Sequence, residues 1–339
     1  MKVTNKDLEC TLKILDELIE DYKDKTVFDK RNWRTYEQRF AERLQKAFTE
    51  LQPLVQEAIS SIKIVKTEFR GRNSSMTIEQ KTLLVLLKHL ISKSNRNMSV
   101  MLIVFSWLTK ISVSYKTIER LYSDEEVVLV LNNLYFLMLR KKGIKTSDSC
   151  GDGTGYSLSI KTNYCAEAQK LKDNAKGINT KEYKKTKFIY SFTLMDIKTR
   201  MYIAFGTSFK SEQDAFFKAK QILIETKISL DSIRLDKYYS AQMYAELFEK
   251  QFLDIALFFI PKNNATIRGP WIWKRMLYHL ITDPHTYLEE YYKRNQSESG
   301  HAEDKKRTGW KLGQKREDRV ETANTLTVLW HNLAWLADA

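Results

Sequence analysis

The first 142 residues contain almost nothing that interrupts a helix: one glycine, Gly71, and one proline, Pro53. Glycine and proline are the strongest local breaks in helices and strands. Their scarcity predicts that residues 1–142 are almost entirely helical. Within this region, Lys63 to Ser75 is rich in lysine, arginine and serine and is expected to form a basic loop.

Cysteines and long apolar runs are also few. Cys10, Cys150 and Cys165 form an odd set without CxxC spacing, so neither a disulfide framework nor a zinc site is indicated. The longest largely apolar run, Val100 to Leu108, is too short to span a bilayer, and the N-terminus shows no signal or transit pattern. These absences predict a cytoplasmic protein without a membrane partner.

The balance of charge is strongly basic. The chain has 56 Lys and Arg against 42 Asp and Glu, which gives a formal net charge of +14 and a pI of about 9.4. Such an excess indicates a polyanionic partner, with nucleic acid as the first expectation and an anionic membrane surface as the second. The 339 residues, 43% of them hydrophobic, are enough for two folded domains.

A helix-turn-helix is predicted within residues 98–122. A helical pattern over residues 98–109 is followed by a short turn, and Ser114 is a suitable N-cap for a second helix, SYKTIERLY. Packing of two short helices within an all-helical domain is the alternative, because such pairs are common. The side chains of the second helix that are available to phosphates or base edges are Tyr115, Lys116, Thr117 and Arg120.

The composition changes at Gly143, where a segment typical of an α/β fold begins. Five strand-like runs occur together with two helical patterns, at residues 211–226 and 240–251. This order predicts a five-stranded sheet of mixed direction, with an all-α domain at 1–142 and an α/β domain at 143–339. The runs lie at residues 156–160, 188–194, 201–205, 233–235 and 255–260. The insert between the first two runs, residues 161–187, carries eight lysines and is expected to form a basic flap.

Near the end of the chain, four polar side chains fall on one side of a predicted helix. If the segment is helical, Tyr291, Arg294, Glu298 and Lys305 lie within a ~60° arc at ~100° per residue, and we call these four residues the polar ridge. A carboxylate between two cations and a phenol suits metal-assisted chemistry on phosphates, whereas a solvated helix face is the alternative. Gly300 is expected to interrupt this helix.

Metal-assisted chemistry on phosphates needs further carboxylates, and two aspartates earlier in the chain are candidates. Asp152, in CGDGTGYSLSI, is expected to open the first strand, among glycines that let a DNA backbone approach closely; Asp148, read as the end of a linker, is its rival. Asp236, in IRLDKYYSAQ, ends an apolar strand, whereas its rival Asp231 begins that strand. Ser240 is the expected N-cap of the next helix.

The spacing of the polar ridge, Y-x2-R-x3-E-x6-K, resembles the last catalytic region of the DDE-type insertion-sequence transposases of bacteria and archaea. The segments around Asp152 and Asp236 are similar to the first and second aspartate regions of that family. The second region is usually written D-K-G-Y-D/S, and here Tyr238 stands where glycine is usual. The resemblance covers residues 143–339, while the preceding helices resemble the family's DNA-binding region only loosely.

The resemblance implies a ribonuclease H-like catalytic domain in which Asp152, Asp236 and Glu298 bind two Mg2+ ions, with Mn2+ as a substitute. Two metal ions ~3.5–4 Å apart clamp the attacking and leaving oxygens of an in-line displacement. Hard oxygen ligands such as carboxylates are those that Mg2+ prefers. Glu303 and Asp304 are nearby acids that fall outside the family spacing.

The resemblance also implies partners and an activity. Residues 1–142 would bind the terminal repeats of a transposon, and the protein would act as a homodimer on DNA in the nucleoid, cleaving DNA and joining it to a target. Tyr291, Arg294 and Lys305 would contact phosphates near the scissile bond. The alternatives are a non-catalytic DNA-binding relative and a plain Mg2+-dependent nuclease without strand transfer.

Three further side chains are secondary candidates. Trp271 and Trp273, in RGPWIWKR, either stack on an unpaired base of a cleaved DNA end or pack a short connector. Among the five histidines, only His301 falls near the polar ridge. No metal-ligand or Ser-His-Asp spacing includes any of them.

Overall fold

The computed structural model describes residues 4–25, 32–62, 76–92, 94–104, 110–157, 188–314 and 316–337. The predicted basic loop at 63–75 and the predicted basic flap at 161–187 therefore lie outside the described residues. Among the helices that are described, none is both long and apolar enough to cross a membrane.

The described part of residues 1–142 is almost entirely helical, as predicted. Thr77 and Gln80 form a capping box at the start of one helix, and Ser114 caps another through the Thr117 N–H. Gly143, with φ 73°, ends the last of these helices in the left-handed conformation that favours glycine. The helices are α1 (Asn5–Lys25), α2 (Trp33–Ser60), α3 (Ile78–Ile91), α4 (Asn95–Val104), α6 (Tyr115–Leu121) and α7 (Glu125–Lys142).

The second part of the chain forms a five-stranded sheet of mixed direction, which confirms that prediction. The strand order is β3-β2-β1-β4-β5. β1, β2 and β3 are antiparallel neighbours, while β4 and β5 run parallel to β1. The strands are β1 (Thr146–Ser157), β2 (Phe188–Asp196), β3 (Tyr202–Ser208), β4 (Ser229–Arg234) and β5 (Ala256–Phe258).

The first strand begins ten residues earlier than predicted, at Thr146. Asp152 therefore lies inside β1 rather than opening it, and Asp148 belongs to the strand rather than to a linker. Small polar side chains replace the usual β-branched residues here, and they are satisfied by hydrogen bonds: Ser147 Oγ lies 2.6 Å from Asp196 Oδ1, and Ser232 Oγ donates to Asp148.

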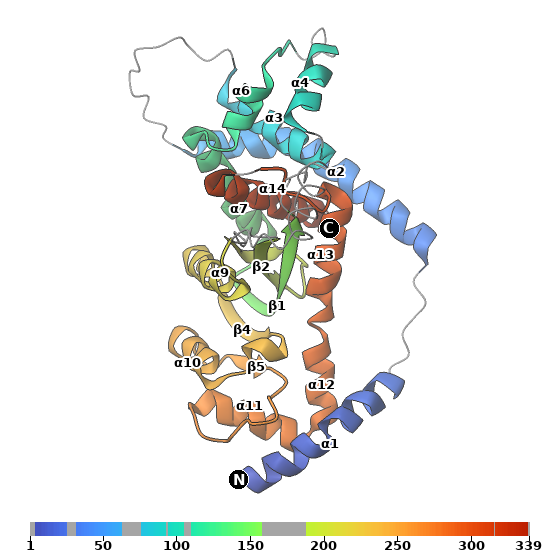
Figure 1. The fold of residues 1–339 in the computed structure, drawn as a ribbon, viewed down its shortest axis with the longest axis vertical. Helices are drawn as coiled ribbons and strands as arrows, with labels where there is room; N and C mark the ends of the chain where they lie inside the picture. Colours follow the sequence, from blue (N-terminus) through green and yellow to red (C-terminus); the bar gives the residue numbers. More distant parts are fainter. Residues whose placement is uncertain are drawn as a thin grey trace, which may run out of the picture.

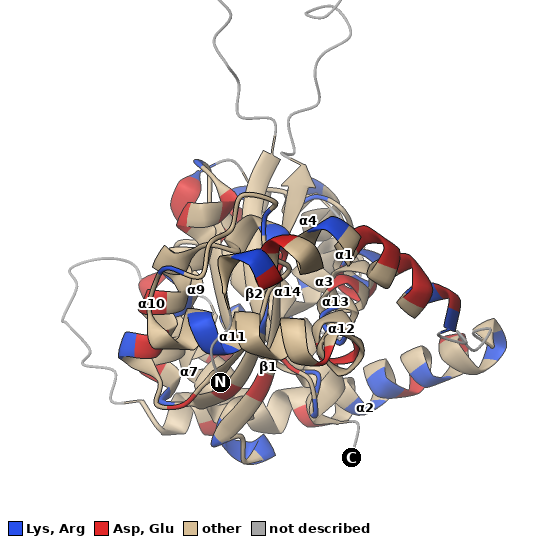
Figure 2. Ribbon diagram, turned by 90° about the horizontal axis from the view of Figure 1, so that it is seen from below, with Lys and Arg blue, Asp and Glu red and all other residues tan. Residues whose placement is uncertain are grey.

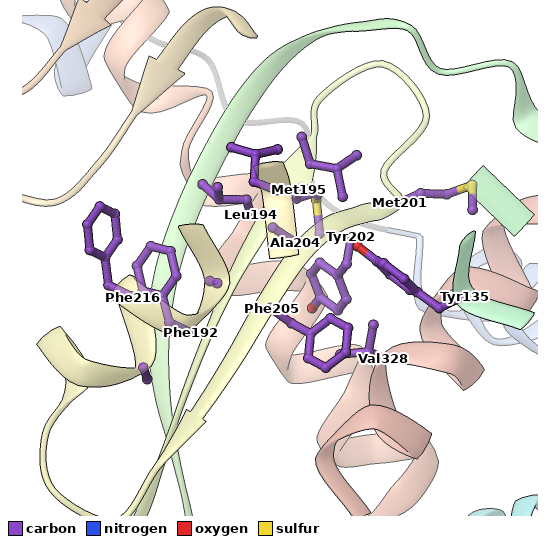
Figure 3. Packing of buried hydrophobic residues seen from close by; sticks show 14 of the residues in the cluster. Tyr135, Phe192, Leu194, Met195, Met201, Tyr202, Ala204, Phe205, Phe216 and Val328 are labelled. Carbon is purple, nitrogen blue, oxygen red and sulfur yellow. The ribbon is translucent and has the colours of Figure 1, made fainter. Parts of the chain in front are cut away.

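Helices cover both faces of the sheet (Figure 1). α9 (Glu212–Thr226) packs on one face, where Phe216 meets Phe192 edge-on at 5.2 Å between ring centroids. α7 and α14 (Glu317–Leu336) cover the other, where Tyr135 meets Phe205 at the same distance and Val328 lies beside them (Figure 3). The sheet is therefore buried on both sides.

The last helix connects the sheet to the N-terminal helices. α14 packs against α2, α3 and α7 as well as β3, and Trp330 Nε1 donates to the Leu86 carbonyl at 3.0 Å. One continuous cluster of buried residues runs through both parts of the chain. The division at residues 142 and 143 stays a prediction about folding units.

The polar ridge is carried by two stacked helices rather than by one. α12 (Pro284–Tyr292) and α13 (Asn295–Thr308) form one column beside the sheet (Figure 1), joined by a tight turn in which the Arg294 N–H donates to the Tyr291 carbonyl. Gly300 does not interrupt the helix, which corrects that expectation. A Cβ at Gly300 would collide with Met195 and Tyr202, so glycine lets α13 approach the sheet closely.

The remaining elements surround β4 and β5. They are the 3-10 turn η1 (Lys237–Tyr239), α10 (Gln242–Gln251) and α11 (Trp271–Thr282). Ala241, and not Ser240, is the N-cap residue of α10, because the Ser240 N–H instead closes η1 onto the Lys237 carbonyl. α1 lies against α11 and α12, where Tyr22 stacks on Tyr292 at 5.1 Å.

Charges of both signs are distributed over the outer helices (Figure 2). α1 and α2 each carry acids and bases along their length. The basic excess of the chain is therefore not concentrated on these two helices.

Candidate active site

The two predicted aspartates lie on neighbouring strands at the same level of the sheet. β1 runs parallel to β4, and the last residues paired between them are Cys150 and Arg234. Asp152 and Asp236 each lie two residues further along, Asp152 within β1 and Asp236 just beyond β4. Because paired residues of neighbouring strands point to the same face, this register places the two aspartates on the same face of the sheet, at the carboxyl end of β4.

Asp152 is partly buried and has a perturbed pKa. Burial raises the pKa of Asp152 to about 6; the Glu298 and Glu212 carboxylates add to the rise, whereas the Arg294 guanidinium and the Gly153 N–H oppose it. Ionising Asp152 therefore costs free energy. A bound cation would offset that cost.

Asp236 begins the turn η1. Its Oδ1 accepts a hydrogen bond from the Lys237 N–H at 2.7 Å. Asp236 also lies near the phenol of Tyr291: burial is the main reason that the pKa of Tyr291 rises to about 12, and the Asp236 charge contributes. The second aspartate thus faces the start of the polar ridge.

All three predicted acids influence the pKa of one guanidinium group, that of Arg294. Arg294 Nη2 lies 2.9 Å from Glu298 Oε1. Burial opposes the charge of Arg294, but Tyr291 and the carboxylates of Glu298, Asp236 and Asp152 outweigh it and raise the pKa. Arg294 Nε is buried and has no hydrogen-bond partner among the described residues. Arg294 is therefore in direct contact with Glu298 and within electrostatic range of Asp152 and Asp236, with one donor unused.

The first and last residues of the polar ridge differ in exposure. Tyr291 is 5% exposed, and the Arg294 guanidinium carbon lies 5.6 Å from the centroid of its ring. Lys305 is partly buried and its Nζ donates to Thr154 Oγ1 at 2.7 Å. Burial lowers the pKa of Lys305, although the nearby acids oppose this effect. Tyr291 is thus placed to orient Arg294, whereas Lys305 lies along β1.

Buried polar contacts fix the two helices that carry the ridge. Arg234 of β4 donates from Nε to the Glu290 carbonyl oxygen at 2.7 Å and forms an ion pair with the Glu290 carboxylate, which anchors α12. Asp304 anchors α13, because it accepts a hydrogen bond from Tyr202 Oη at 2.7 Å and lies 2.8 Å from His331 Nδ1. The position of Glu298 therefore depends on contacts with the sheet and with α14.

The His301 ring contacts the backbone of the first predicted aspartate, Asp152. His301 Nε2 lies 3.3 Å from the Asp152 backbone oxygen and 3.4 Å from Thr193 Oγ1. Burial lowers the pKa of His301 to about 4, so the ring is neutral at pH 7. His301 thus contacts the backbone of Asp152 and not its carboxylate.

The glycines beside Asp152 serve protein packing. A Cβ at Gly151 would collide with Leu235 and Leu194, and a Cβ at Gly153 would collide with the side chain of Glu212. The expectation that these two glycines open the site to a DNA backbone is therefore wrong, because protein side chains already fill the space.

Glu212 is a site residue that the sequence analysis missed. It begins α9, accepts a hydrogen bond from Tyr239 Oη at 2.9 Å, and lies against Gly153 near the Asp152 carboxylate. In the sequence, Glu212 is simply an acid in the first turn of a helix, directly after the Ser211 N-cap. Acids are favourable at this position in helices generally, so nothing marks Glu212 as a site residue. Only the packing of α9 on β1 reveals its proximity to the other acids.

The acids that rival Glu298 have structural partners. Glu303 Oε1 lies 3.3 Å from Arg43 Nη2, and Asp304 is buried within the contacts described above. Asp231, which is the rival of Asp236 and not of Glu298, is exposed at the beginning of β4. Glu298, with its side chain 50% exposed, is the most accessible of the acids on α13.

The predicted helix-turn-helix residues lie on α6, which packs against α4. Lys116 and Arg120 are exposed. The Tyr115 ring is covered by Arg96, whose guanidinium carbon lies 5.0 Å from the ring centroid, and the Thr117 hydroxyl takes part in the N-cap of α6. The two basic side chains are therefore the accessible members of this set.

The side chains of the three predicted acids have the chemistry that a magnesium site needs, but they do not lie close enough together to form one. In the described ranges, no three His, Cys, Asp or Glu side chains lie close enough together to hold one metal ion. Carboxylate oxygens are nevertheless the ligands that Mg2+ prefers, and Asp152, Asp236 and Glu298 act on the same guanidinium. Glu298 is held by a single, half-exposed ion pair to Arg294, and such pairs contribute little to stability.

Replacing Asp152 with asparagine is expected to stabilise the metal-free protein at neutral pH. Because the folded-state pKa is raised to about 6, the native state binds the proton more tightly than the unfolded chain, and stability falls as pH rises from about 4 to 6. Allowing for residual solvent exposure, the variant should gain about 1–2 kcal/mol at pH 7.5 and almost nothing at pH 4. Urea unfolding of both proteins at the two pH values measures this difference, and equal gains at both would contradict it.

Comparison with known proteins identifies a relative along nearly the whole chain. The chain is 40% identical over 334 residues, covering 98% of its own length and 96% of the relative's, to a protein of Archaeoglobus fulgidus described as a probable transposase for insertion sequence element ISA1214. No family model matches the chain, and no solved structure matches it. The chain therefore belongs to the insertion-sequence transposases.

Proposed function

We propose that the protein is a DDE-type transposase whose residues 143–339 form a ribonuclease H-like catalytic domain. The observation that supports this proposal most is the parallel register of β1 and β4, in which Asp152 and Asp236 lie at the same level of neighbouring strands. Convergence of Glu298 on the same guanidinium supports it. The mixed five-stranded sheet, with acids on adjacent central strands, is the arrangement that the proposal requires.

Asp152, Asp236 and Glu298 would hold Mg2+, for which Mn2+ would substitute. When bound, the metal would activate the attacking oxygen and neutralise charge on the leaving oxygen. In cleavage, water attacks the phosphorus and the bond to the 3′ oxygen breaks. In strand transfer, the resulting 3′-hydroxyl attacks a phosphodiester of the target DNA, which leaves one new phosphodiester bond and one free 3′-hydroxyl.

The chain's own side chains would position the phosphates. Arg294 can present its guanidinium fork to a phosphate, and Tyr291 keeps that group oriented. Lys305 adds a positive charge further along β1. The carboxylate of Glu212, which lies near Asp152, would favour cation binding there.

Residues 1–142 would bind the ends of the transposon. Lys116 and Arg120, exposed on α6, are the side chains that we propose for contacts with phosphates or bases. Two copies acting on paired ends would form a homodimer. The basic excess of +14 favours DNA as the partner.

A joining assay separates this proposal from a plain nuclease. Purified protein is given either intact transposon ends with Mg2+ or precut ends carrying a free 3′-hydroxyl together with target DNA. We expect both cleavage and joining. Cleavage without joining would indicate a nuclease.

A binding-only relative is the second candidate, because the Arg294–Glu298 ion pair occupies one of the three carboxylates. DNA binding without cleavage or joining would identify it. Mg2+ titration in a thermal-shift assay gives a readout that does not depend on activity. We expect Mg2+ to raise the melting temperature of the wild-type protein and to leave that of Asp152→Asn nearly unchanged, since a ligand that binds only the folded state stabilises it. No shift for the wild type would favour the binding-only candidate.

A further inference from the structure

The N-terminal helix α2 packs directly against the helix that carries Glu298. α2 crosses α13 near the carboxyl-terminal end of α13 (Figure 1). Arg43 Nη2 of α2 lies 3.3 Å from Glu303 Oε1 of α13, and each of these side chains is only 9% exposed. Charged side chains are rarely buried to this degree unless they are paired. A buried ion pair therefore joins the N-terminal helices to a helix of the candidate active site.

This ion pair belongs to a continuous chain of charged groups. Arg307 bridges two acids of α13: its Nη2 lies 3.7 Å from Glu303 Oε2, and its Nη1 lies 3.2 Å from Asp304 Oδ1. Asp304 in turn contacts Tyr202 of β3 and His331 of α14. The chain of contacts thus runs from α2 through α13 to the sheet and to α14. In such a network, the loss of one member affects the others.

Aromatic contacts reinforce the packing of α2 on α13. The centroid of the Phe40 ring lies 4.9 Å from Lys306 Nζ and 5.3 Å from the Arg307 guanidinium carbon. The Arg43 guanidinium carbon lies 4.1 Å from the centroid of the Trp335 ring. Phe40 and Arg43 are three residues apart and so lie on one side of α2. This side of α2 therefore faces α13 and α14.

Two anchors hold α13 from different directions. Glu303 and Asp304 are consecutive residues, so they leave the helix ~100° apart, one toward α2 and the other toward the sheet and α14. Glu298 lies ~7.5 Å along the helix axis from Glu303 and ~140° around it. Arg294, the N-cap residue of α13, makes no side-chain capping hydrogen bond. The orientation of the half of α13 that carries Glu298 therefore depends also on the anchors in the other half.

We propose that Arg43 is a positioning residue for Glu298: by holding Glu303 it fixes the rotation of α13, which keeps the Glu298 carboxylate on the side of Arg294, where Mg2+ would bind. This inference rests on the proposed function. It gives α2, in the region proposed to bind DNA ends, a second role in completing the metal site. Arg43 would act through the helix, from the side of α13 away from Glu298, and not on the substrate.

Binding of Mn2+ tests the proposal with a readout that does not depend on catalysis. The electron paramagnetic resonance signal of free Mn2+ broadens on binding, so a titration of the full-length protein below its melting temperature gives the affinity. Arg43→Gln should weaken Mn2+ binding about 10-fold, the lower end of the ~10–100-fold loss typical of groups that orient metal ligands. DNA affinity, measured without metal, should stay unchanged, because Arg43 is buried.

A double-mutant cycle and a matched control define the contact. Glu303→Gln should weaken Mn2+ binding to the same degree, and its combination with Arg43→Gln should add little, because both changes break one contact. Arg43→Lys keeps the charge and should recover part of the affinity. Glu37→Gln should bind Mn2+ like the wild type: it removes an ion pair with Lys306 between the same two helices, but Glu37 is 55% exposed.

Each contrary result has a distinct meaning. Unchanged Mn2+ affinity in Arg43→Gln, even with a lower melting temperature, would show a merely structural contact and overturn the positioning proposal while leaving the transposase proposal in place. Fully additive losses in the double variant would do the same. If the wild-type protein neither bound Mn2+ nor cleaved DNA ends, the proposed function would fail as well. If Arg43→Gln does not fold, the comparison of Glu303→Gln with Glu37→Gln decides the proposal in the same way.

Discussion

Asp152→Asn is expected to abolish Mg2+-dependent cleavage of DNA while leaving DNA affinity unchanged or increased. Asparagine preserves the size of the side chain and removes the charge that would bind the metal. A metal ion contributes several kcal/mol to stabilisation of the transition state, and each ~1.4 kcal/mol is tenfold in rate, so the loss should be about 10³-fold or more. Affinity should not fall, because a carboxylate repels the phosphates of DNA.

The same result is expected for Asp236→Asn and Glu298→Gln, since the three acids act together. Asp231→Asn is the matched control: it removes an exposed carboxylate at the beginning of β4, away from the convergence on Arg294. Nicking rates and DNA affinities of the four variants are measured under one set of conditions. Residual nicking equal to that of the control in any of the three would count against its assignment.

Asp304→Asn is expected to destabilise the fold strongly. Asp304 is 1% exposed and bonds Tyr202, His331 and Arg307, with Arg307 Nη1 at 3.2 Å from its Oδ1. Burial acts to raise the pKa of Asp304, but the partner charges prevail and lower it, so the carboxylate stays ionised. Removing one member of a buried ionic network leaves the others without compensation, which typically costs about 3–5 kcal/mol.

Urea unfolding at pH 7 measures this loss. Glu298→Gln is the matched control, because it changes a half-exposed acid of the same helix and should alter stability by less than about 1 kcal/mol. If Asp304→Asn matched this control, the network would not be what holds α13 in place. Because the folded-state pKa of Asp304 is lowered, its stabilising contribution should be present above about pH 4 and be lost at more acid pH.

Local signals in the sequence predict many elements of this fold. The capping box of Thr77 and Gln80, the N-cap at Ser114 and the end of α7 at Gly143 all lie where their chemistry predicts, because caps and left-handed residues are determined within a few positions. The five strands and their mixed directions also follow from the order of apolar runs and helices. These features depend on short segments.

Features that depend on tertiary packing were not predictable in the same way. β1 begins in a polar, serine-rich segment that has no strand pattern, and it is a strand because β2 and β4 pair with it on both sides. The turn at Arg294 has no glycine or proline to mark it, whereas Gly300, which does suggest a break, instead permits contact with Met195. Local composition could not distinguish these two outcomes.

In the candidate site, too, some residues are indicated by local sequence and others only by tertiary packing. The spacing of the polar ridge identifies Arg294 and Glu298, which the structure places in contact. Glu212 carries no motif, and its proximity to β1 arises only from the docking of α9. Sequence reasoning therefore identified the acids of the resemblance but missed the neighbours that complete their surroundings.

The location of bound Mn2+ tests the central claim most directly. Crystals of the protein with a DNA end are soaked in Mn2+, and anomalous diffraction locates the metal. Convergence of three distant acids predicts manganese peaks within coordinating distance of the carboxylates of Asp152, Asp236 and Glu298. Peaks elsewhere, or carboxylates that stay apart with no metal between them, would contradict the assignment of this site.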